Sequence, residues 1–259
     1  MILTIIVAAG SGTRMGAEQP KQFLPLSGEP IVMRTLRRMS EGVEKYLTDC
    51  SRNVDGIVEN RMYVDNCVHK LILVLPQAYI PLWRELCEKH AFHLPHEIVP
   101  GGATRFHSVK NGLAAYPDAE IVLVHDGVRP FVDDAAIARV IAGAHEYGAA
   151  VPAVPVVDSL RRMTGSDGES VSADRSAYRA VQTPQGFQGN LLRAAYARPY
   201  DERFTDDASV VEASGLLPRG VVLTEGSPAN IKITTPVDWA VAEVLLKTEF
   251  PGGAELPVT

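Results

Sequence analysis

The segment Ile5–Phe23, I-I-V-A-A-G-S-G-T-R-M-G-A-E-Q-P-K-Q-F, combines an apolar run with a glycine-rich loop and two cations. Its glycines are Gly10, Gly12 and Gly16, and its cations are Arg14 and Lys21. Glycines let the backbone approach an anion and turn its N–H groups toward it, while the cations add charge that amides lack. The alternative is a merely structural turn, which does not explain the two cations. The spacing fits neither G-x-G-x-x-G nor the Walker motif, so the loop predicts a different polyphosphate site.

Two further motifs could complete such a site. In G-G-A-T-R-F-H-S-V, residues 101–109, Gly102 allows close backbone approach and Ser108 offers a hydroxyl at the start of a helix; an ordinary capped helix start is the alternative. In V-H-D-G-V-R-P-F, residues 124–131, Asp126 ends an apolar strand, where it could hold Mg²⁺ or a ribose hydroxyl. Arg129 could pair with Asp126 or reach a substrate, or the two could only close a loop.

Lys232 and Thr183 stand out in the last third of the chain. Lys232 lies in N-I-K-I-T-T-P, where a charge between apolar neighbours suggests a functional role. Thr183 lies in A-V-Q-T-P-Q-G-F, next to a rigid turn. The chain has no Ser-His-Asp order and no H-E-x-x-H motif. Cations and glycines are therefore plentiful, but no general base is evident.

The elements that must position these residues alternate between strands and helices. This predicts an α/β fold of Rossmann-like type, a mostly parallel sheet flanked by helices, with ligands beyond the carboxyl ends of the strands. The predicted strands are Leu3–Ala8, Lys70–Leu75, Glu97–Val99, Ile121–His125, Ala149–Val154, Val221–Thr224 and Asn230–Ile233. The predicted helices are Ile31–Met39, Ile80–Ala91, Thr104–Ala115, Asp133–Glu146, Gly189–Ala197, Asp206–Ala213 and Pro236–Lys247, with Thr104, Asp133 and Thr235 as caps.

We expect one domain over residues 1–259, with three segments outside the regular pattern. Residues 155–181 carry a G-S-D-G turn between strand-like flanks and predict a hairpin arm leaving the main sheet. Residues 41–66 are mixed and charged, and suggest an inserted helix and loop without an assignable role. Residues 251–259 are expected to form a disordered tail.

Composition excludes several classes of protein. A net charge of −6 argues against a nucleic-acid-binding surface. Three cysteines without C-x-x-C spacing indicate neither a disulfide framework nor a zinc site. The apolar residues 1–9 lack a basic flank and are too short for a signal peptide or a membrane span, so we expect no membrane partner and a cytoplasmic location.

Five motifs, taken together and in order, resemble the 2-C-methyl-D-erythritol 4-phosphate cytidylyltransferase family over nearly the whole chain. They are A-A-G-S-G-T-R-M-G…P-K-Q-F, G-G-A-T-R-x-x-S-V, H-D-G-V-R-P-F, A-V-Q-T-P-Q-G-F and N-I-K-I-T-T-P-x-D. The resemblance implies a nucleotidyltransferase of isoprenoid synthesis that transfers CMP from CTP to a polyol phosphate. It also implies Mg²⁺ dependence and a homodimer formed through the arm.

Roles for individual residues follow from the same resemblance. Arg14, Lys21 and Lys232 correspond to catalytic cations that contact phosphates. Ala8, Ala9, Gly10, Gly12, Gly102, Ser108 and Asp126 correspond to the nucleotide site, with Asp126 also a candidate for the metal, directly or through water. Arg129, Ser159, Arg175, Thr183 and Thr205 correspond to acceptor-binding positions, with Arg175 reaching across the dimer. Ser159 stands where many relatives carry threonine, a change that keeps the hydroxyl.

The implied chemistry accounts for the missing base. An acceptor phosphate is already anionic when it attacks the α-phosphorus in line, so the reaction needs alignment and charge neutralisation rather than proton removal. The ribitol-5-phosphate cytidylyltransferases share nearly all the motifs and remain an alternative. The G-G-A-T-R-x-x-S motif argues against sugar-1-phosphate nucleotidylyltransferases, and Arg14, Lys21 and Lys232 together argue against a non-catalytic nucleotide-binding regulator.

Overall fold

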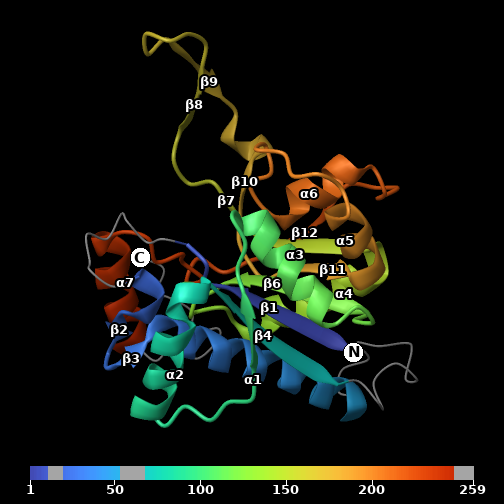
Figure 1. Ribbon diagram of the computed structural model, residues 1–259. Coiled ribbons are helices and arrows are strands. Elements are labelled where there is room, and N and C mark those ends of the chain that lie inside the picture. The colour runs from blue at the N-terminus through green and yellow to red at the C-terminus, as the bar shows by residue number, and fades with distance from the viewer. Residues whose placement is uncertain (11–19, 53–67, 248–259) are drawn as a thin grey trace.

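A central eight-stranded sheet organises the chain, as the computed structural model shows for residues 1–10, 20–52 and 68–247 (Figure 1). The strand order is β10-β7-β11-β6-β1-β4-β5, and β12 also pairs with β7. Neighbours β6, β1, β4 and β5 run parallel, whereas β11 is antiparallel to both β6 and β7. Its strands are β1 (Ile2–Val7), β4 (His69–Leu75), β5 (Glu97–Pro100), β6 (Ile121–Asp126), β7 (Ala149–Pro155), β10 (Arg179–Val181), β11 (Gln185–Gln188) and β12 (Val222–Glu225).

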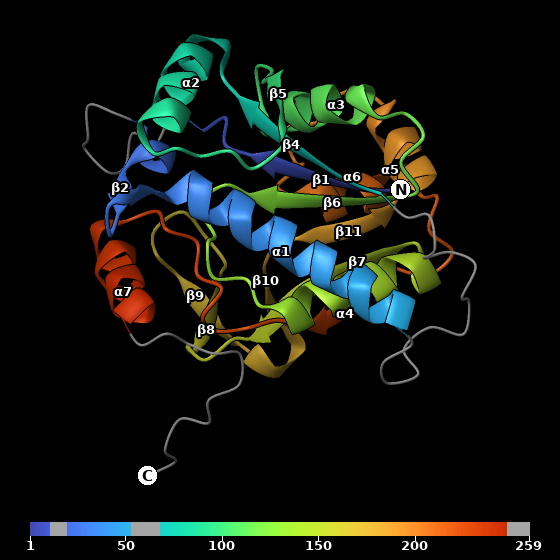
Figure 2. The same ribbon diagram turned by 90° about the horizontal axis from the view of Figure 1, so that it is seen from below.

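Helices cover both faces of the sheet because alternate residues of the buried strands point to opposite sides. On one face α1, α2 and α4 pack against Ile2 and Ile6 of β1, and Figure 2 shows α1 crossing that face. On the other face α3, α5 and α6 pack against Leu3 and Ile5. The helices are α1 (Ile31–Arg52), α2 (Ile80–Lys89), α3 (Arg105–Ala115), α4 (Asp134–Tyr147), α5 (Gly189–Tyr196), α6 (Asp207–Ser214) and α7 (Pro236–Lys247).

The predicted fold class, the seven helices and six of the seven strands are confirmed; α1 runs well past its predicted end at Met39, and the other elements shift only slightly at their ends. The seventh, Asn230–Ile233, was predicted as a strand and is irregular. The Ile233 N–H donates a single bond to the carbonyl of Val128, at 3.0 Å, but no ladder follows. β-branched residues favour strands only where a neighbouring strand is present to pair with them, and this segment has none among the described residues.

Residues 41–52 of the predicted insertion are helical as expected, but they continue α1 without a break to Arg52 instead of forming a separate inserted helix. Val43 is fully buried, and a Cβ on Gly42 would lie 2.4 Å from Cδ1 of Ile137. The continuation therefore belongs to the contact between α1 and α4, and the glycine permits their close approach. Residues 53–66 of the predicted insertion and the predicted tail, 251–259, lie outside the described residues.

The arm is confirmed as a hairpin that projects from the body of the molecule (Figure 1). Strands β8 (Leu160–Met163) and β9 (Ser170–Ala173) pair antiparallel and make no sheet contact with the core. At the base, Pro155 of β7 pairs with Arg179 of β10, so the chain leaves and re-enters at one place. A second small ladder, β2 (Pro25–Leu26) with β3 (Glu29–Pro30), precedes α1.

Candidate active site

A cavity of about 400 Å³ opens at the carboxyl ends of β1 and β6, where ligands bind in sheets of this kind. The end of β1, the start of α3, the end of β6 and the segment before α7 all contribute to its wall. Seven predicted site residues line it: Ala8, Ala9, Gly10, Lys21, Gly102, Asp126 and Lys232. Arg14 and Gly12 lie outside the described residues.

The glycine turn before α3 is packed tightly against its own helix. A Cβ on Gly102 would lie 2.3 Å from Cβ of His107, so no larger residue fits without moving the backbone. The Gly102 N–H donates to Oγ of Ser108 at 3.1 Å, and the Ser108 hydroxyl donates to the carbonyl of Thr104 at 2.9 Å. Ser108 is fully buried. Its hydroxyl therefore shapes the turn from beneath rather than facing the cavity.

Gln22, which the sequence analysis did not select, supports the opposite wall. It is buried, and its Nε2 donates to the carbonyl of Ala8 at 2.7 Å. The neighbouring Phe23 stacks on Trp83 with 6.3 Å between ring centroids. Lys21 thus lies on a short 3₁₀ helix, Lys21–Phe23, whose other two residues are anchored in the core. This anchoring fixes where the lysine backbone meets the cavity.

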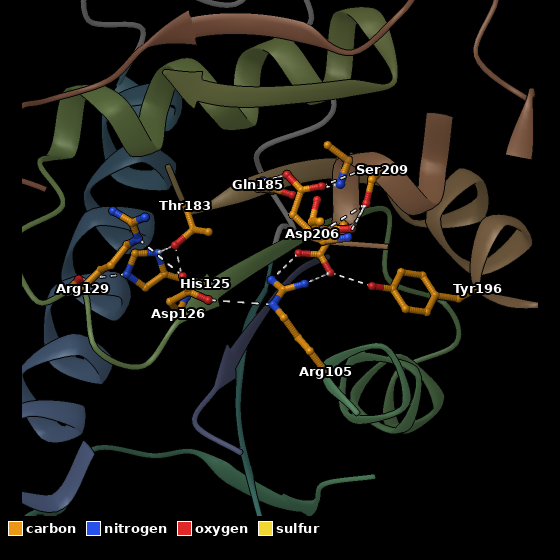
Figure 3. Close-up of polar contacts among 12 residues, drawn as sticks. Arg105, His125, Asp126, Arg129, Thr183, Gln185, Tyr196, Asp206 and Ser209 are labelled. Carbon is orange, nitrogen blue, oxygen red and sulfur yellow. Dashed lines mark hydrogen bonds and ion pairs between the residues drawn. The ribbon is translucent and has the colours of Figure 1, made fainter. Parts of the chain in front are cut away.

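Asp126 is surrounded by three cations, of which Figure 3 shows Arg105 and Arg129. Its carboxylate lies 2.9 Å from Nζ of Lys232, 3.4 Å from Nε of Arg129 and 3.9 Å from Nε of Arg105. Burial alone would raise the pKa of Asp126, but the charges of Arg105, Lys232 and Arg129 outweigh it and hold the pKa well below its usual value. Asp126 therefore remains ionised and acts as a fixed counter-charge.

A buried hydrogen-bond chain sets the position of Asp126. The Asp126 N–H donates to Oγ1 of Thr183 at 3.1 Å, and that hydroxyl lies 2.9 Å from Nδ1 of His125. Nε2 of His125 lies 3.0 Å from the carbonyl of Arg129, which can only accept, so Nε2 carries the proton and the Thr183 hydroxyl donates to Nδ1. Burial lowers the pKa of His125 to about 4, which keeps the ring neutral. The Thr183 hydroxyl therefore already donates its one proton to His125 within the protein.

Asn230 holds the irregular segment that carries Lys232. It is fully buried, its Nδ2 donates to the carbonyl of Thr183 at 2.8 Å, and its own carbonyl accepts from Arg129 at 2.7 Å. Ile233, on the other side of Lys232, is bonded to Val128. Lys232 therefore lies between two residues, Asn230 and Ile233, that are hydrogen-bonded to the rest of the protein. This explains how a segment without a strand partner can present a lysine to the cavity.

Arg105, Asp207 and Tyr196 form a second charged cluster that sequence reasoning did not find. Arg105 donates to both oxygens of Asp207, at 2.8 and 2.6 Å, and the Tyr196 hydroxyl donates to the same carboxylate at 2.6 Å. Burial, with Asp207 adding to it, raises the pKa of Tyr196 well above its usual value. Positions 105 and 207 are distant in sequence, so no local spacing indicated the pair. The sequence offers one local indication of the cluster, the aspartate Asp207 in the T-D-D-A-S motif.

None of the five predicted acceptor residues lines the cavity of this chain. Ser159 and Arg175 lie in the arm, and Arg175 donates to the carbonyl of Val157 there. Thr205 is exposed just before α6, with its N–H bonded to Oγ of Ser209 at 3.1 Å. The fourth and fifth, Arg129 and Thr183, support Asp126 from below.

No group of three or more His, Cys, Asp or Glu side chains could hold a metal within the residues that the structure describes. Asp126 is the carboxylate among the described cavity residues, and three cations already surround it. Within the same ranges, no helix is both long and apolar enough to cross a membrane.

The geometry agrees with comparisons to known proteins. The family model for 2-C-methyl-D-erythritol 4-phosphate cytidylyltransferase matches residues 2–49 and 37–248. The chain belongs to this family. It is therefore a nucleotidyltransferase, and the resemblance drawn from five motifs is confirmed.

Relatives and solved structures support the assignment over most of the chain. The 2-C-methyl-D-erythritol 4-phosphate cytidylyltransferase of Bacteroides fragilis is 47% identical, covering 93% of this chain and 98% of the relative. That of Phocaeicola vulgatus is 45% identical, with the same coverage. The crystal structure of 4-diphosphocytidyl-2C-methyl-D-erythritol synthase from Anaerococcus prevotii superposes with a TM-score of 0.71 at 27% identity, covering 95% of this chain and 98% of that one. For the Thermus thermophilus cytidylyltransferase the TM-score is 0.68 at 32% identity, with 95% and 100% covered.

Proposed function

We propose that this enzyme transfers CMP from CTP to 2-C-methyl-D-erythritol 4-phosphate, giving 4-diphosphocytidyl-2-C-methyl-D-erythritol and pyrophosphate. The observation that carries the proposal is the cavity itself. Lys21 and Lys232 line one space with the glycine turn at Gly102, at the carboxyl ends of the central strands. Backbone amides and lysines at this edge suit a triphosphate. The relatives that match nearly the whole chain carry this activity in their names.

The absence of a suitable base supports a phosphate nucleophile. Among the described residues that line the cavity there is no histidine or cysteine. The lowered pKa of Asp126 makes its carboxylate a poor proton acceptor. His125 is buried, with both ring nitrogens hydrogen-bonded. An acceptor phosphate needs no deprotonation, so the site can work by alignment and charge alone.

In the proposed step an acceptor phosphate oxygen attacks the α-phosphorus while the bond to pyrophosphate breaks. Negative charge then accumulates on the oxygens around the phosphorus and on the leaving group. We assign Lys21, Lys232 and, from the resemblance, Arg14 to that charge. We assign Ala8, Ala9, Gly10 and the turn at Gly102 to the cytidine.

The donors of this site fit a Mg²⁺ ion that is bound chiefly by the triphosphate. Mg²⁺ often takes one or two carboxylates and completes its shell with water and substrate phosphates. Asp126 is the residue that would meet it, directly or through water. When bound, the ion would shield the triphosphate and assist the departure of pyrophosphate.

The arm suits a homodimer. Val157, Met163, Val171 and Tyr178 are large apolar side chains exposed along it, at 77%, 59%, 42% and 48%. An apolar surface of this kind on a projecting hairpin is typical of an interface. We propose that two copies associate through their arms, and that Ser159 and Arg175 of one reach the acceptor in the cavity of the other, together with Arg129, Thr183 and Thr205.

The direct test is release of pyrophosphate by the purified protein with CTP and Mg²⁺. Methylerythritol phosphate and ribitol 5-phosphate are supplied at equal concentrations, and Lys232→Ala serves as the inactive control. We expect turnover with methylerythritol phosphate to exceed turnover with ribitol 5-phosphate by at least tenfold, and to be lost in the variant. Preference for ribitol 5-phosphate, or activity with neither, would overturn the proposed acceptor.

A further inference from the structure

Arg105 joins two parts of the molecule that the proposed reaction uses separately. Its side chain lines the cavity beside the glycine turn, and its Nε lies 3.9 Å from Asp126. Its two terminal nitrogens form a bidentate pair with Asp207, at the start of α6. One planar guanidinium therefore faces both Asp126, which lines the cavity, and Asp207, which does not. Figure 3 shows Arg105 with the dashed line to Asp126.

Asp207 is a rigid anchor for this contact. Its side chain is fully buried, and besides Arg105 it accepts the Tyr196 hydroxyl. The Tyr196 ring stacks on Phe106, the residue after Arg105, with 4.6 Å between centroids. The pair and its neighbours thus join α3, α5 and α6 in one cluster. A bidentate ion pair of this type fixes orientation as well as distance.

The start of α6 is held just as firmly on its other side. Gln185 of β11 donates to Asp206 at 2.8 Å and accepts from the N–H of Ala208 at 3.0 Å. Asp206 caps α6 together with Ser209 in a reciprocal pair of bonds. A change in the position of Arg105 would therefore be transmitted to the turn before α6 rather than absorbed by a loose contact.

Arg105 differs from the two cavity lysines, Lys21 and Lys232, in the net charge that it adds to the anion site. Asp207 neutralises Arg105 as a local pair, so Arg105 adds little net charge to the anion site. Lys232 and Arg129 share Asp126, two cations to one carboxylate, so this group stays positive. What Arg105 supplies is therefore geometry.

We propose that Arg105 is a positioning residue that couples the nucleotide cavity to the start of α6, with Asp207 and Tyr196 as its fixed anchor. The inference rests on the proposed use of CTP. Nucleotide bound beside the glycine turn constrains Arg105, which in turn constrains Asp207 and the turn that carries Thr205. Binding of CTP thereby further stabilises the turn that carries Thr205.

Hydrogen exchange on the full-length enzyme tests the coupling without any acceptor. With CTP and Mg²⁺ as the probe, we expect exchange at the amides of residues 205–209 to slow at least threefold in the wild type. Arg105→Lys keeps the charge but loses the bidentate geometry and should abolish the slowing. The matched variant Arg139→Lys, on the outer surface of α4, should leave it intact. CTP binding without slowed exchange in the wild type would overturn the inference, whereas no CTP binding at all would overturn the proposed function and this inference with it.

Kinetics distinguishes positioning from charge. We expect Arg105→Lys to lower kcat at least thirtyfold while the Kd for CTP stays within threefold of the wild-type value. A kcat within threefold of the wild type would show that charge suffices and would overturn the inference. If that variant fails to fold, Tyr196→Phe decides, since it leaves Arg105 intact. A three- to tenfold loss of kcat at unchanged Kd supports the coupling, and wild-type values of both contradict it.

Discussion

Lys232 and Asp126 form a direct ion pair, with 2.9 Å between Nζ and Oδ2, although they lie in different segments and Lys232 belongs to no strand. The lysine side chain is 44% exposed and the aspartate side chain 11%. A buried carboxylate thus holds a half-exposed ammonium group at the cavity edge. An arriving phosphate meets a cation that is already oriented, which is the arrangement that electrostatic catalysis requires.

Removal of that cation should affect turnover more than folding. Lys232→Ala is expected to lower kcat by roughly a hundredfold or more, because one oriented charge at a developing anion is worth that much. Pyrophosphate release at saturating CTP measures the effect. Lys45→Ala is the matched control, since Lys45 is an exposed lysine of α1 that is paired with Asp134 of α4. A drop of less than tenfold in Lys232→Ala would contradict the catalytic assignment.

Replacement of Asp126 should destabilise the protein at neutral pH. Asp126→Asn leaves three cations without their counter-charge, a loss of about 3–5 kcal/mol in unfolding free energy by analogy with broken buried pairs. The pKa of Asp126 is depressed in the folded state, so the stabilisation is complete above its usual value of 3.8 and is lost as the pH falls below that value. Urea denaturation from pH 7 to pH 3 should therefore show a constant gap between wild type and variant down to about pH 4 and the beginning of its narrowing below that pH. A gap that is constant with pH would contradict the depressed pKa.

The buried histidines should make the protein less stable in mild acid. Burial lowers the pKa of both His125 and His69 to about 4, and burial also lowers the pKa of His96. Between pH 6.5 and pH 4 these histidines bind protons in the unfolded chain but not in the folded chain. The free energy of unfolding therefore falls, as the pH is lowered, by up to about 1.4 kcal/mol per pH unit for each histidine. His69→Gln should reduce this slope by one proton. The exposed His93→Gln should leave it unchanged, and an equal effect of both variants would contradict the assignment.

A side chain at the glycine turn should weaken nucleotide binding. Gly102→Ala places a methyl group 2.3 Å from Cβ of His107, which forces the turn to move. We expect the Kd for CTP to rise about tenfold, equivalent to about 1.4 kcal/mol. Isothermal titration calorimetry measures it. Gly220→Ala is the control because its Cβ would meet no atom within 4 Å. Unchanged affinity in Gly102→Ala would show that the turn does not contact the nucleotide.

A charge on the arm should separate the proposed dimer. Val157→Asp places a carboxylate at an apolar position that is 77% exposed in the single chain. Burial of that charge in an interface is costly, so we expect a monomer in sedimentation analysis and at least a tenfold loss of turnover. Val237→Asp, at a position 72% exposed on α7, is the matched control. A monomeric wild type, or a dimer that both variants leave intact, would contradict association through the arm.

Local signals were enough to predict most of the framework. Ile5, Ile72 and Val124 lie in apolar runs that could only be buried strands, and their parallel pairing follows from the helices between them. The Thr104 and Asp133 caps fixed two helix starts, since each side chain accepts from the backbone as predicted. Gly10 and Gly102 line one cavity, and their contact with an anion stays a prediction.

The remaining features depend on contacts that no local pattern records. Strand β11, Q-G-F-Q, was not predicted because it is short and its sequence does not alternate between apolar and polar residues. It lies between β6 and β7 and is antiparallel to both. The pair of Arg105 and Asp207 joins α3 to α6. The Thr183 hydroxyl is bonded to His125 and to the N–H of Asp126, and only the tertiary structure reveals these contacts.

The pairing of Pro155 with Arg179 at the base of the arm has a consequence for how this fold can vary. Because the hairpin leaves and re-enters the sheet at this one residue pair, its length and tip can change without altering the order of the strands. Insertions there incur only the small entropy of a longer closed loop. The arm is thus a replaceable module, whose exposed apolar surface can change while the cavity at the carboxyl ends of β1 and β6 stays the same.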